Sequence, residues 1–257
     1  MDLALFGGLI GIGLLGGFMA GFLGIGGAII IIPLLLYGVP ALLPSTHSAM
    51  TMNLATGISM VQAFFATLSG LVVHRRNRTL DLKLGLALGV TGVVGALAGS
   101  FGSAHVASRT LLSIYLGLIA VALLLLFAAP RAEKAKAEVN LALALPIGLG
   151  VGVLGGLLGV GGGFVIIPLM IAVLRVPTRI AVGTSLLVVL MTTLAGAMGK
   201  IATGQFDLQT ATFVILGSIV GAQLGGRLNS RVSAKTLRAS LTLLLIAIGF
   251  RTGMDLI

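Results

Sequence analysis

The sequence predicts an all-α polytopic membrane protein built from two inverted repeats, and three observations support this fold class. Of the 257 residues, 58% are hydrophobic and only 9% are charged, whereas a soluble domain carries about 25% charged residues. A glycine-rich segment at 21–33 recurs at 156–168, and the Lys and Arg content of the loops reverses between the two halves. We therefore expect each half to contain a broken, re-entrant helical hairpin followed by three transmembrane helices.

Apolar runs of spanning or near-spanning length predict the helices in chain order, since a crossing needs about 20 residues. These runs cover 3–22, 48–73, 84–104, 110–129, 141–158, 180–199, 209–226 and 236–257. Two shorter apolar arms follow the glycine-rich segments, at 28–38 and 163–174. Each arm holds about 12 residues, or roughly 18 Å of helix, and reaches only partway across a bilayer.

The internal repeat defines the domain organisation. Gly24, Gly26, Gly27 and Pro33 match Gly159, Gly161, Gly162 and Pro168 at a constant offset of 135 residues. A second block, which includes Asp81 and Asp207, aligns at an offset of 126 residues. We predict a first inverted repeat at 1–129, a cytoplasmic linker at 130–140 and a second inverted repeat at 141–257.

The basic residues of the loops predict the topology. Loop 74–83 has four Lys and Arg and its repeat partner 200–207 has one, whereas loop 104–109 has one and its partner 226–238 has four. This reversal is expected when two halves insert in opposite directions. The positive-inside rule then favours both termini on the non-cytoplasmic side of the cell inner membrane, in a multi-pass protein.

The glycine breaks have the chemistry of an anion site. Glycine permits a sharp reversal and leaves its backbone N–H unshielded, and a helix that begins there presents partial positive charge and unpaired donors to an anion. The predicted substrate-binding residues at the breaks are Gly26, Gly27, Ala28, Gly161, Gly162 and Gly163. The predicted structural hinges are Gly24, Pro33, Gly159 and Pro168. The alternative interpretation is that these glycines only permit close helix packing.

Polar side chains in the spans provide further candidate substrate donors: His47, Ser48, Asn53, Gln62, Thr184 and Ser185. The segment with His47 and Ser48 could instead cap a helix, and Asn53 and Gln62 could instead form interhelical hydrogen bonds. We interpret His74 and His105 as interfacial loop residues. Lys200 and Arg251, the latter with Asp255 as its partner, are expected to extend to the membrane interface or to draw anions toward an outer vestibule.

Several function classes are excluded or disfavoured by the sequence. The chain has no cysteine, its three histidines lack acidic companions, and its six acidic residues lie in loops or at span ends. We therefore predict no metal site, no cofactor, no catalytic residues and no cation pump. The basic residues are divided among short loops, which disfavours nucleic acid as a partner. The predicted partners are a small anionic substrate and the lipid bilayer.

The duplicated signature resembles that of the TauE/SafE sulfite exporter (sulfonate permease) family. Each copy reads Gly-x-x-Gly-x-Gly-Gly, then Ala or Gly, with Pro five residues later, and Val182-Gly183-Thr184-Ser185 is a further point of similarity. Ala28, where the second copy has Gly163, is a departure from the pattern. The resemblance implies an inner-membrane permease for sulfite, organosulfonates or related sulfur-containing anions. From the paired helix breaks we expect it to work by alternating access.

Two other functions stay open at this point. An anion channel or facilitator of the same architecture would have the same sequence features. An intramembrane enzyme is the second alternative, but a serine hydrolase needs a nucleophile with a base in reach. The sequence has no Gly-x-Ser-Gly motif before a second-half histidine and no histidine after His105.

Overall fold

The computed structural model describes residues 3–39, 50–76, 79–128 and 141–254, and all regular elements in these ranges are helices. The helices of the first half are α1 (Leu3–Leu23), α2 (Ala28–Pro33), the π-helix η1 (Leu34–Gly38), α4 (Met52–Arg76), α5 (Leu82–Gly102), the 3₁₀ turn η2 (Ser103–His105) and α6 (Ser108–Ala128). Those of the second half are α7 (Leu141–Leu158), α8 (Gly163–Ala172), α9 (Thr178–Ala202), α10 (Leu208–Asn229) and α11 (Ala234–Met254).

Seven helices of the described residues are long and apolar enough to cross a membrane, which confirms the predicted all-α polytopic class. They are α1, α4, α5, α6, α9, α10 and α11. The apolar helix α7 and the arms α2 and α8 are shorter. Many apolar side chains on α6 and α11 are exposed, including Leu124, Phe127 and Phe250, as expected for helices that face lipid.

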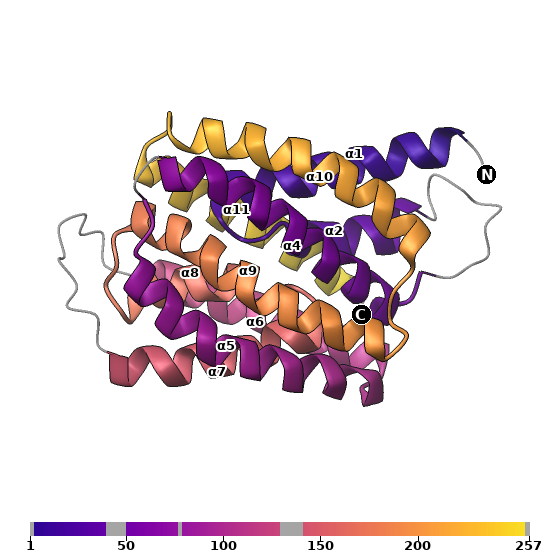
Figure 1. Cartoon of the computed structure of the whole chain (residues 1–257), viewed down its shortest axis with the longest axis horizontal. Helices are drawn as coiled ribbons and strands as arrows, with labels where there is room; N and C mark the ends of the chain where they lie inside the picture. Colours follow the sequence, from indigo (N-terminus) through magenta and orange to yellow (C-terminus); the bar gives the residue numbers. More distant parts are fainter. Residues whose placement is uncertain (1–2, 40–49, 77–78, 129–140, 255–257) are drawn as a thin grey trace.

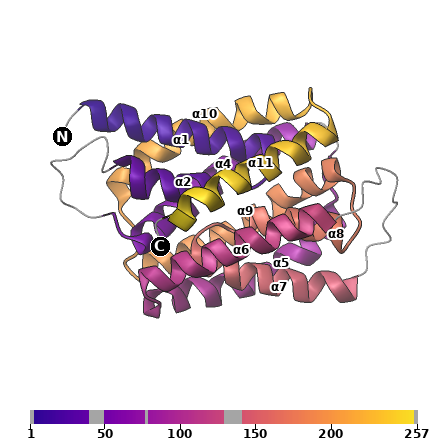
Figure 2. The same ribbon diagram turned by 180° about the vertical axis from the view of Figure 1, so that it is seen from behind.

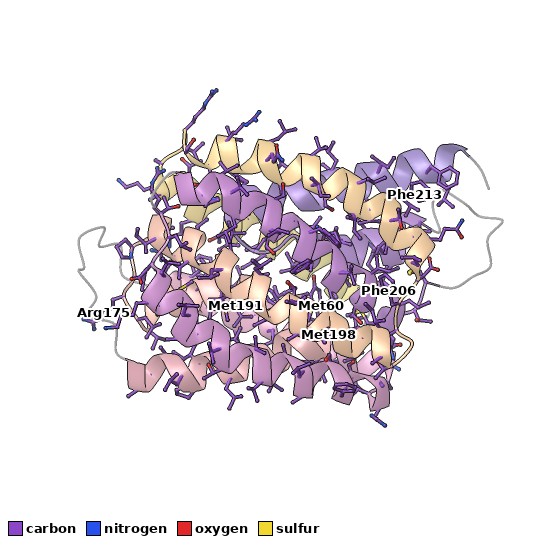
Figure 3. The ribbon with its side chains drawn as sticks, viewed as in Figure 1. Met60, Arg175, Met191, Met198, Phe206 and Phe213 are labelled. Atoms are coloured by element: carbon purple, nitrogen blue, oxygen red, sulfur yellow. The ribbon has the colours of Figure 1, made fainter. Side chains whose placement is uncertain are left out.

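The helices lie side by side in a bundle with α4 and α9 at its centre. In Figure 1, α1 and α10 form one edge of the bundle, α5 and α7 form the opposite edge, and α4 and α9 lie between them. Seen from behind in Figure 2, α6 and α11 cover the near face. Met60 of α4 is labelled in Figure 3, and its side chain fills the space left by Gly196 of α9. α4 and α9 are the most buried of the seven spans, and both lie beside the glycine breaks.

Equivalent helices of the two halves have equivalent packing partners. α1 packs on α10 as α7 packs on α5, and α4 packs on α10 as α9 packs on α5. The arm α2 packs on α4 as α8 packs on α9. Each hairpin thus lies against a helix of the opposite half, so the repeats seen in the sequence are interleaved in space.

Glycine allows the closest of these contacts, between α1 and α10. A Cβ atom at Gly13 would lie 2.0 Å from the carbonyl oxygen of Val214, and one at Gly217 would lie 2.0 Å from that of Ile10. Such distances are sterically impossible for any larger residue. The expected close packing through small residues in membrane helices is therefore present, in positions outside the breaks.

The helix ends and the connections between helices lie at the two ends of the bundle. In Figures 1 and 2 the start of α1 and the end of α11 lie at one end, whereas the end of α4, the end of α10 and the starts of α5 and α11 lie at the other. Arg175, between α8 and α9, is at this second end as well (Figure 3). The arms α2 and α8 extend toward opposite ends (Figures 1 and 2). Which end faces the cytoplasm stays a prediction.

Candidate functional site

The two hairpins are interrupted by backbone that only glycine adopts readily. Between α1 and α2, the φ angles of Gly24, Gly26 and Gly27 are 75°, 80° and 78°; between α7 and α8, those of Gly159, Gly161 and Gly162 are 70°, 61° and 76°. An L-residue with a side chain is strained in this left-handed region. The six glycines at equivalent places in the repeat thus share one backbone conformation, and we call these segments the first break (residues 24–27) and the second break (residues 159–162).

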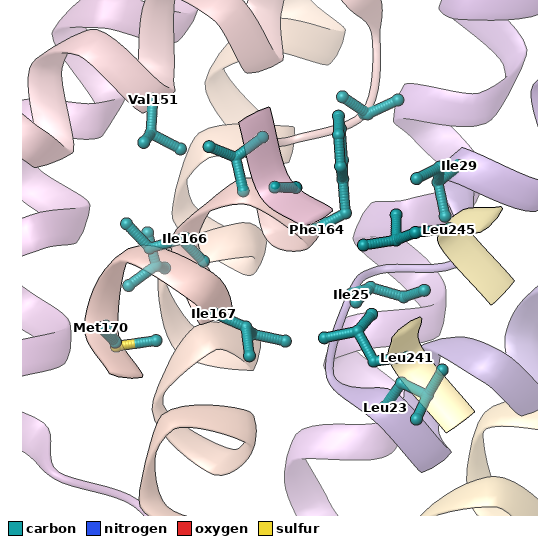
Figure 4. Close-up of a cluster of buried hydrophobic side chains, with 14 of the residues drawn as sticks. Leu23, Ile25, Ile29, Val151, Phe164, Ile166, Ile167, Met170, Leu241 and Leu245 are labelled. Atoms are coloured by element: carbon teal, nitrogen blue, oxygen red, sulfur yellow. The ribbon is translucent and has the colours of Figure 1, made fainter. Parts of the chain in front are cut away.

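The two breaks touch each other inside the protein. A Cβ at Gly163, the first residue of α8, would lie 2.4 Å from the carbonyl oxygen of Ile25 in the first break. Figure 4 shows Ile25 near side chains of both arms, including Ile29 of α2 and Phe164 of α8. Ile25 and Gly163, which are 138 positions apart in sequence, are thereby brought into contact.

Six backbone amides, at the breaks and at the first residues of the two arms, are unpaired. Within the described residues, no backbone hydrogen bond is donated by the amides of Gly26, Gly27, Ala28, Gly161, Gly162 and Gly163. The carbonyl groups of the residues before the arms are paired within the arms. That of Gly27 accepts from Ile30 and Ile31, and that of Gly162 accepts from Val165 and Ile166. Unpaired amides at the start of a helix are suited to anionic oxygen atoms.

A serine on each central helix holds one break in place. The Ser185 hydroxyl of α9 donates to the carbonyl oxygen of Gly24 at 2.8 Å, and the Ser59 hydroxyl of α4 donates to that of Gly159 at 2.8 Å. Sequence reasoning selected Ser185 as a substrate donor and missed Ser59. The signal was available, because Ser59 and Ser185 are related by the same 126-residue offset as Asp81 and Asp207.

α9 contacts both breaks. The Thr192 hydroxyl donates to the carbonyl oxygen of Gly161 at 2.8 Å, a contact that sequence reasoning also missed. A methyl group of Val189 would lie 2.8 Å from a Cβ at Gly26 and 3.1 Å from one at Gly161. Val189 therefore lies where the two breaks come together, and a side chain larger than glycine at either position would displace it.

Gln62 is the most informative polar side chain of this region. It is completely buried in α4, and neither its amide nitrogen nor its amide oxygen has a hydrogen-bond partner. It lies three residues from Ser59, which holds the second break, and next to Ala63, whose side chain is near Gly26 of the first. A buried amide without partners costs stability, so packing alone does not account for Gln62 at this position.

The other predicted polar donors lie elsewhere. Asn53 also has a buried, unpartnered oxygen, but it is nine residues from Gln62, about 14 Å along α4. The Thr184 hydroxyl accepts from the backbone N–H of Asp81 at 3.0 Å, beside the start of α5. His47 and Ser48 lie outside the described residues.

His74 is a buried residue of α4, so its interpretation as an interfacial loop residue is wrong. Its Nε2 lies 2.9 Å from the carbonyl oxygen of Gly21, and its Nδ1 lies 3.2 Å from the Thr79 hydroxyl. α4 continues to Arg76, three residues beyond the predicted end of this span. The extra turn places the imidazole against the last turn of α1 instead of in a loop.

Lys200 is buried within the protein, which corrects the expectation that its side chain extends outward from the end of a span. It is completely buried near the end of α9, where its ammonium group has four oxygen acceptors. Arg251 is exposed and lies over the ring of Tyr37, 4.3 Å from its centroid; its predicted partner Asp255 is outside the described residues. Among the residues that the structure describes, no group of three His, Cys, Asp or Glu side chains could hold a metal ion.

Comparison with known proteins agrees with the membrane architecture. The family model for the sulfite exporter TauE/SafE matches residues 9–252. The probable membrane transporter protein YunE of Bacillus subtilis is 26% identical over 260 residues, covering 94% of each chain. A probable membrane transporter protein of Xylella fastidiosa is 32% identical over 236 residues, covering 88% of this chain and 85% of the relative. No solved structure is significantly similar.

Proposed function

The chain belongs to the sulfite exporter TauE/SafE family, and on that basis we propose that it carries a small sulfur-containing anion, sulfite or an organosulfonate, across the cell inner membrane. The observation that supports this most directly is the meeting of two glycine breaks whose amides are unpaired, next to the partnerless amide of Gln62. Its relatives are named as probable membrane transporters. A role in transport, and not catalysis, accounts for all of these features.

The proposed site binds an oxyanion mainly through backbone. Oxygen atoms of the substrate accept hydrogen bonds from the amides of Gly26, Gly27 and Ala28 on one side and of Gly161, Gly162 and Gly163 on the other. The Gln62 amide nitrogen adds a side-chain donor. The partial positive charge at the starts of the two arms favours the negative charge of the substrate, without requiring a cation in the break itself.

Transport then requires the two halves to act as inverted repeats, 1–129 and 141–257, joined by the linker 130–140. α2 and α8 extend toward opposite ends of the bundle (Figures 1 and 2), so movement of one hairpin against its neighbours opens the site to one end only. The contact between Gly163 and Ile25 has to widen when substrate enters. This is alternating access around a site at the repeat interface.

Uptake into proteoliposomes tests this proposal. Purified protein is reconstituted and exposed to radiolabelled sulfite, taurine and sulfate, with empty liposomes as the control. We expect saturable uptake of sulfite or taurine, accelerated by unlabelled substrate inside the vesicle. Unsaturable conductance would indicate a channel in place of a carrier, and an absence of flux for all three anions would refute the transport proposal.

A further inference from the structure

The buried ammonium group of Lys200 is unusual because its neighbours do not neutralise it. Its Nζ lies 2.8 Å from the Ser103 hydroxyl, 2.9 Å from the Thr56 hydroxyl, 3.1 Å from Oε1 of Gln205 and 3.3 Å from the carbonyl oxygen of Leu157. All four acceptors are uncharged. A buried charge without a counter-ion is costly, which suggests a function for it.

The carboxylates of the described residues have other roles. They belong to Asp81 and Asp207, and each accepts a hydrogen bond from a backbone amide at the start of a helix, α5 and α10 respectively. Neither is among the acceptors of Lys200. None of the carboxylates that the structure describes therefore pairs with the Lys200 side chain.

Two contacts connect Lys200 with the second break. Leu157 is in the last turn of α7, two residues before Gly159, so the ammonium group offsets the negative end of the helix that leads into the break. Thr56 lies directly against the break, because a Cβ at Gly159 would be 2.2 Å from the Thr56 carbonyl oxygen. Lys200 thus contacts both the helix that enters the break and the α4 residue beside it.

The equivalent place in the first half has no permanent charge. His74 precedes Lys200 by 126 residues, and its imidazole lies against Gly21 in the last turn of α1. The Asn229 amide donates to the carbonyl oxygen of Phe22 at 2.7 Å. Both breaks therefore follow a helix whose end is held by a buried nitrogen side chain, and in the second half this side chain is the amine of Lys200.

We propose that Lys200 is a positioning residue that makes the second break the side on which the charged group of the transported anion binds. This inference depends on the proposed function. The ammonium group keeps its four acceptors and does not itself touch substrate. It compensates the end of α7 and adds positive potential at Gly161, Gly162 and Gly163, in surroundings of low dielectric constant where such a potential is strong.

The test compares Lys200→Gln, Lys200→Arg and wild type. Sulfite affinity is measured in two ways. The first is the KM of radiolabelled sulfite uptake in proteoliposomes. The second is the sulfite concentration that gives half of the maximal rise in melting temperature in detergent. We expect both values to rise about tenfold or more in Lys200→Gln. In Lys200→Arg we expect both values to stay within about threefold of those of wild type. The exposed Lys83 provides the matched control, since Lys83→Gln removes the same charge and is expected to change neither value.

Each outcome decides the inference. A role in folding alone would lower the yield and the maximal rate of Lys200→Gln but leave its affinity for sulfite unchanged, and that result would overturn the proposal. If Lys200→Gln cannot be recovered, a tenfold loss of affinity in Lys200→Arg overturns it, because charge is retained there. Wild-type protein that neither carries nor is stabilised by sulfite, taurine or sulfate would refute the proposed function as well.

Discussion

Among single residues, Gln62 is the one whose environment is least explained by folding. Its amide is buried beside the breaks without a hydrogen-bond partner, while the neighbouring hydroxyls of Ser59, Ser185 and Thr192 are all bonded to carbonyl oxygens of the breaks. The hydroxyls therefore shape the breaks. The Gln62 amide has no such partner, and we propose that it binds the substrate.

The substitution Gln62→Leu separates stability from transport. Replacing an unsatisfied buried amide by an apolar group of similar size removes a cost of about 1–3 kcal/mol, so we expect the melting temperature of the substrate-free protein to rise by about 2 °C or more. We expect sulfite uptake to fall at least about tenfold. Thermal unfolding in detergent and proteoliposome flux are the measurements.

Gln223 offers a matched control for this prediction. It is an exposed glutamine on α10, and Gln223→Leu should leave both the melting temperature and the flux near their wild-type values. If Gln62→Leu transports sulfite as fast as wild type, Gln62 does not bind the substrate.

At the level of elements, the breaks and the short arms form the site at which we propose that an anion binds. Gly27 and Gly162 are the residues before α2 and α8, both with positive φ. Pro33, predicted as a hinge, is the point at which the α-helix α2 changes to the π-helix η1, whereas Pro168 lies inside α8. The two arms thus begin alike and continue differently, which is an asymmetry that the repeated signature does not reveal.

Leucine substitutions test the breaks. In Gly26→Leu and Gly161→Leu the new side chain meets Val189 or Thr193 and the residue must hold a φ of 80° or 61°, so we expect flux to fall below about a tenth of wild type. The matched controls are Gly11→Leu in α1 and Gly150→Leu in α7, where a Cβ meets nothing within 4 Å. These should transport normally.

The readout of this experiment has two parts. The amount of inserted, monodisperse protein is measured by size-exclusion chromatography, and sulfite flux is normalised to that amount. Wild-type rates in both break variants would show that transport does not pass through the glycine segments.

At the scale of the whole molecule, the interleaving of the two halves is the main structural result. α1 and α2 of the first half lie against α10 and α4, and α7 and α8 of the second lie against α5 and α9. A hairpin of one half is therefore supported by a crossing helix of the other. Movement of a hairpin in the proposed transport cycle would therefore involve helices of both halves.

Single cysteines test the predicted topology, because the natural chain has none. Leu82→Cys at the start of α5 and Ser230→Cys after α10 should be labelled from the same side, and Ser108→Cys at the start of α6 from the opposite side. The positive-inside rule predicts that the first two are cytoplasmic. A membrane-impermeant maleimide on intact and permeabilised cells makes the measurement, and labelling of Leu82→Cys and Ser230→Cys from different sides would contradict the inverted arrangement.

The sequence by itself determined the number and order of the helices and the positions of both breaks. These features depend on local properties: the length of apolar runs sets the spans, and six glycines at a constant offset set the places where the backbone takes positive φ. Ser59 could also have been found from its 126-residue offset to Ser185.

Only the tertiary structure decided which polar groups are buried and what they bind. The environment of Lys200 depends on helices from both halves, and that of His74 depends on α1, which is distant in sequence. Thr184 and Ser185 are adjacent in sequence, yet one accepts from the Asp81 amide and the other donates to Gly24. Successive residues of a helix point about 100° apart, so their partners are set by the helices packed on each side, and hydropathy contains no information about that packing.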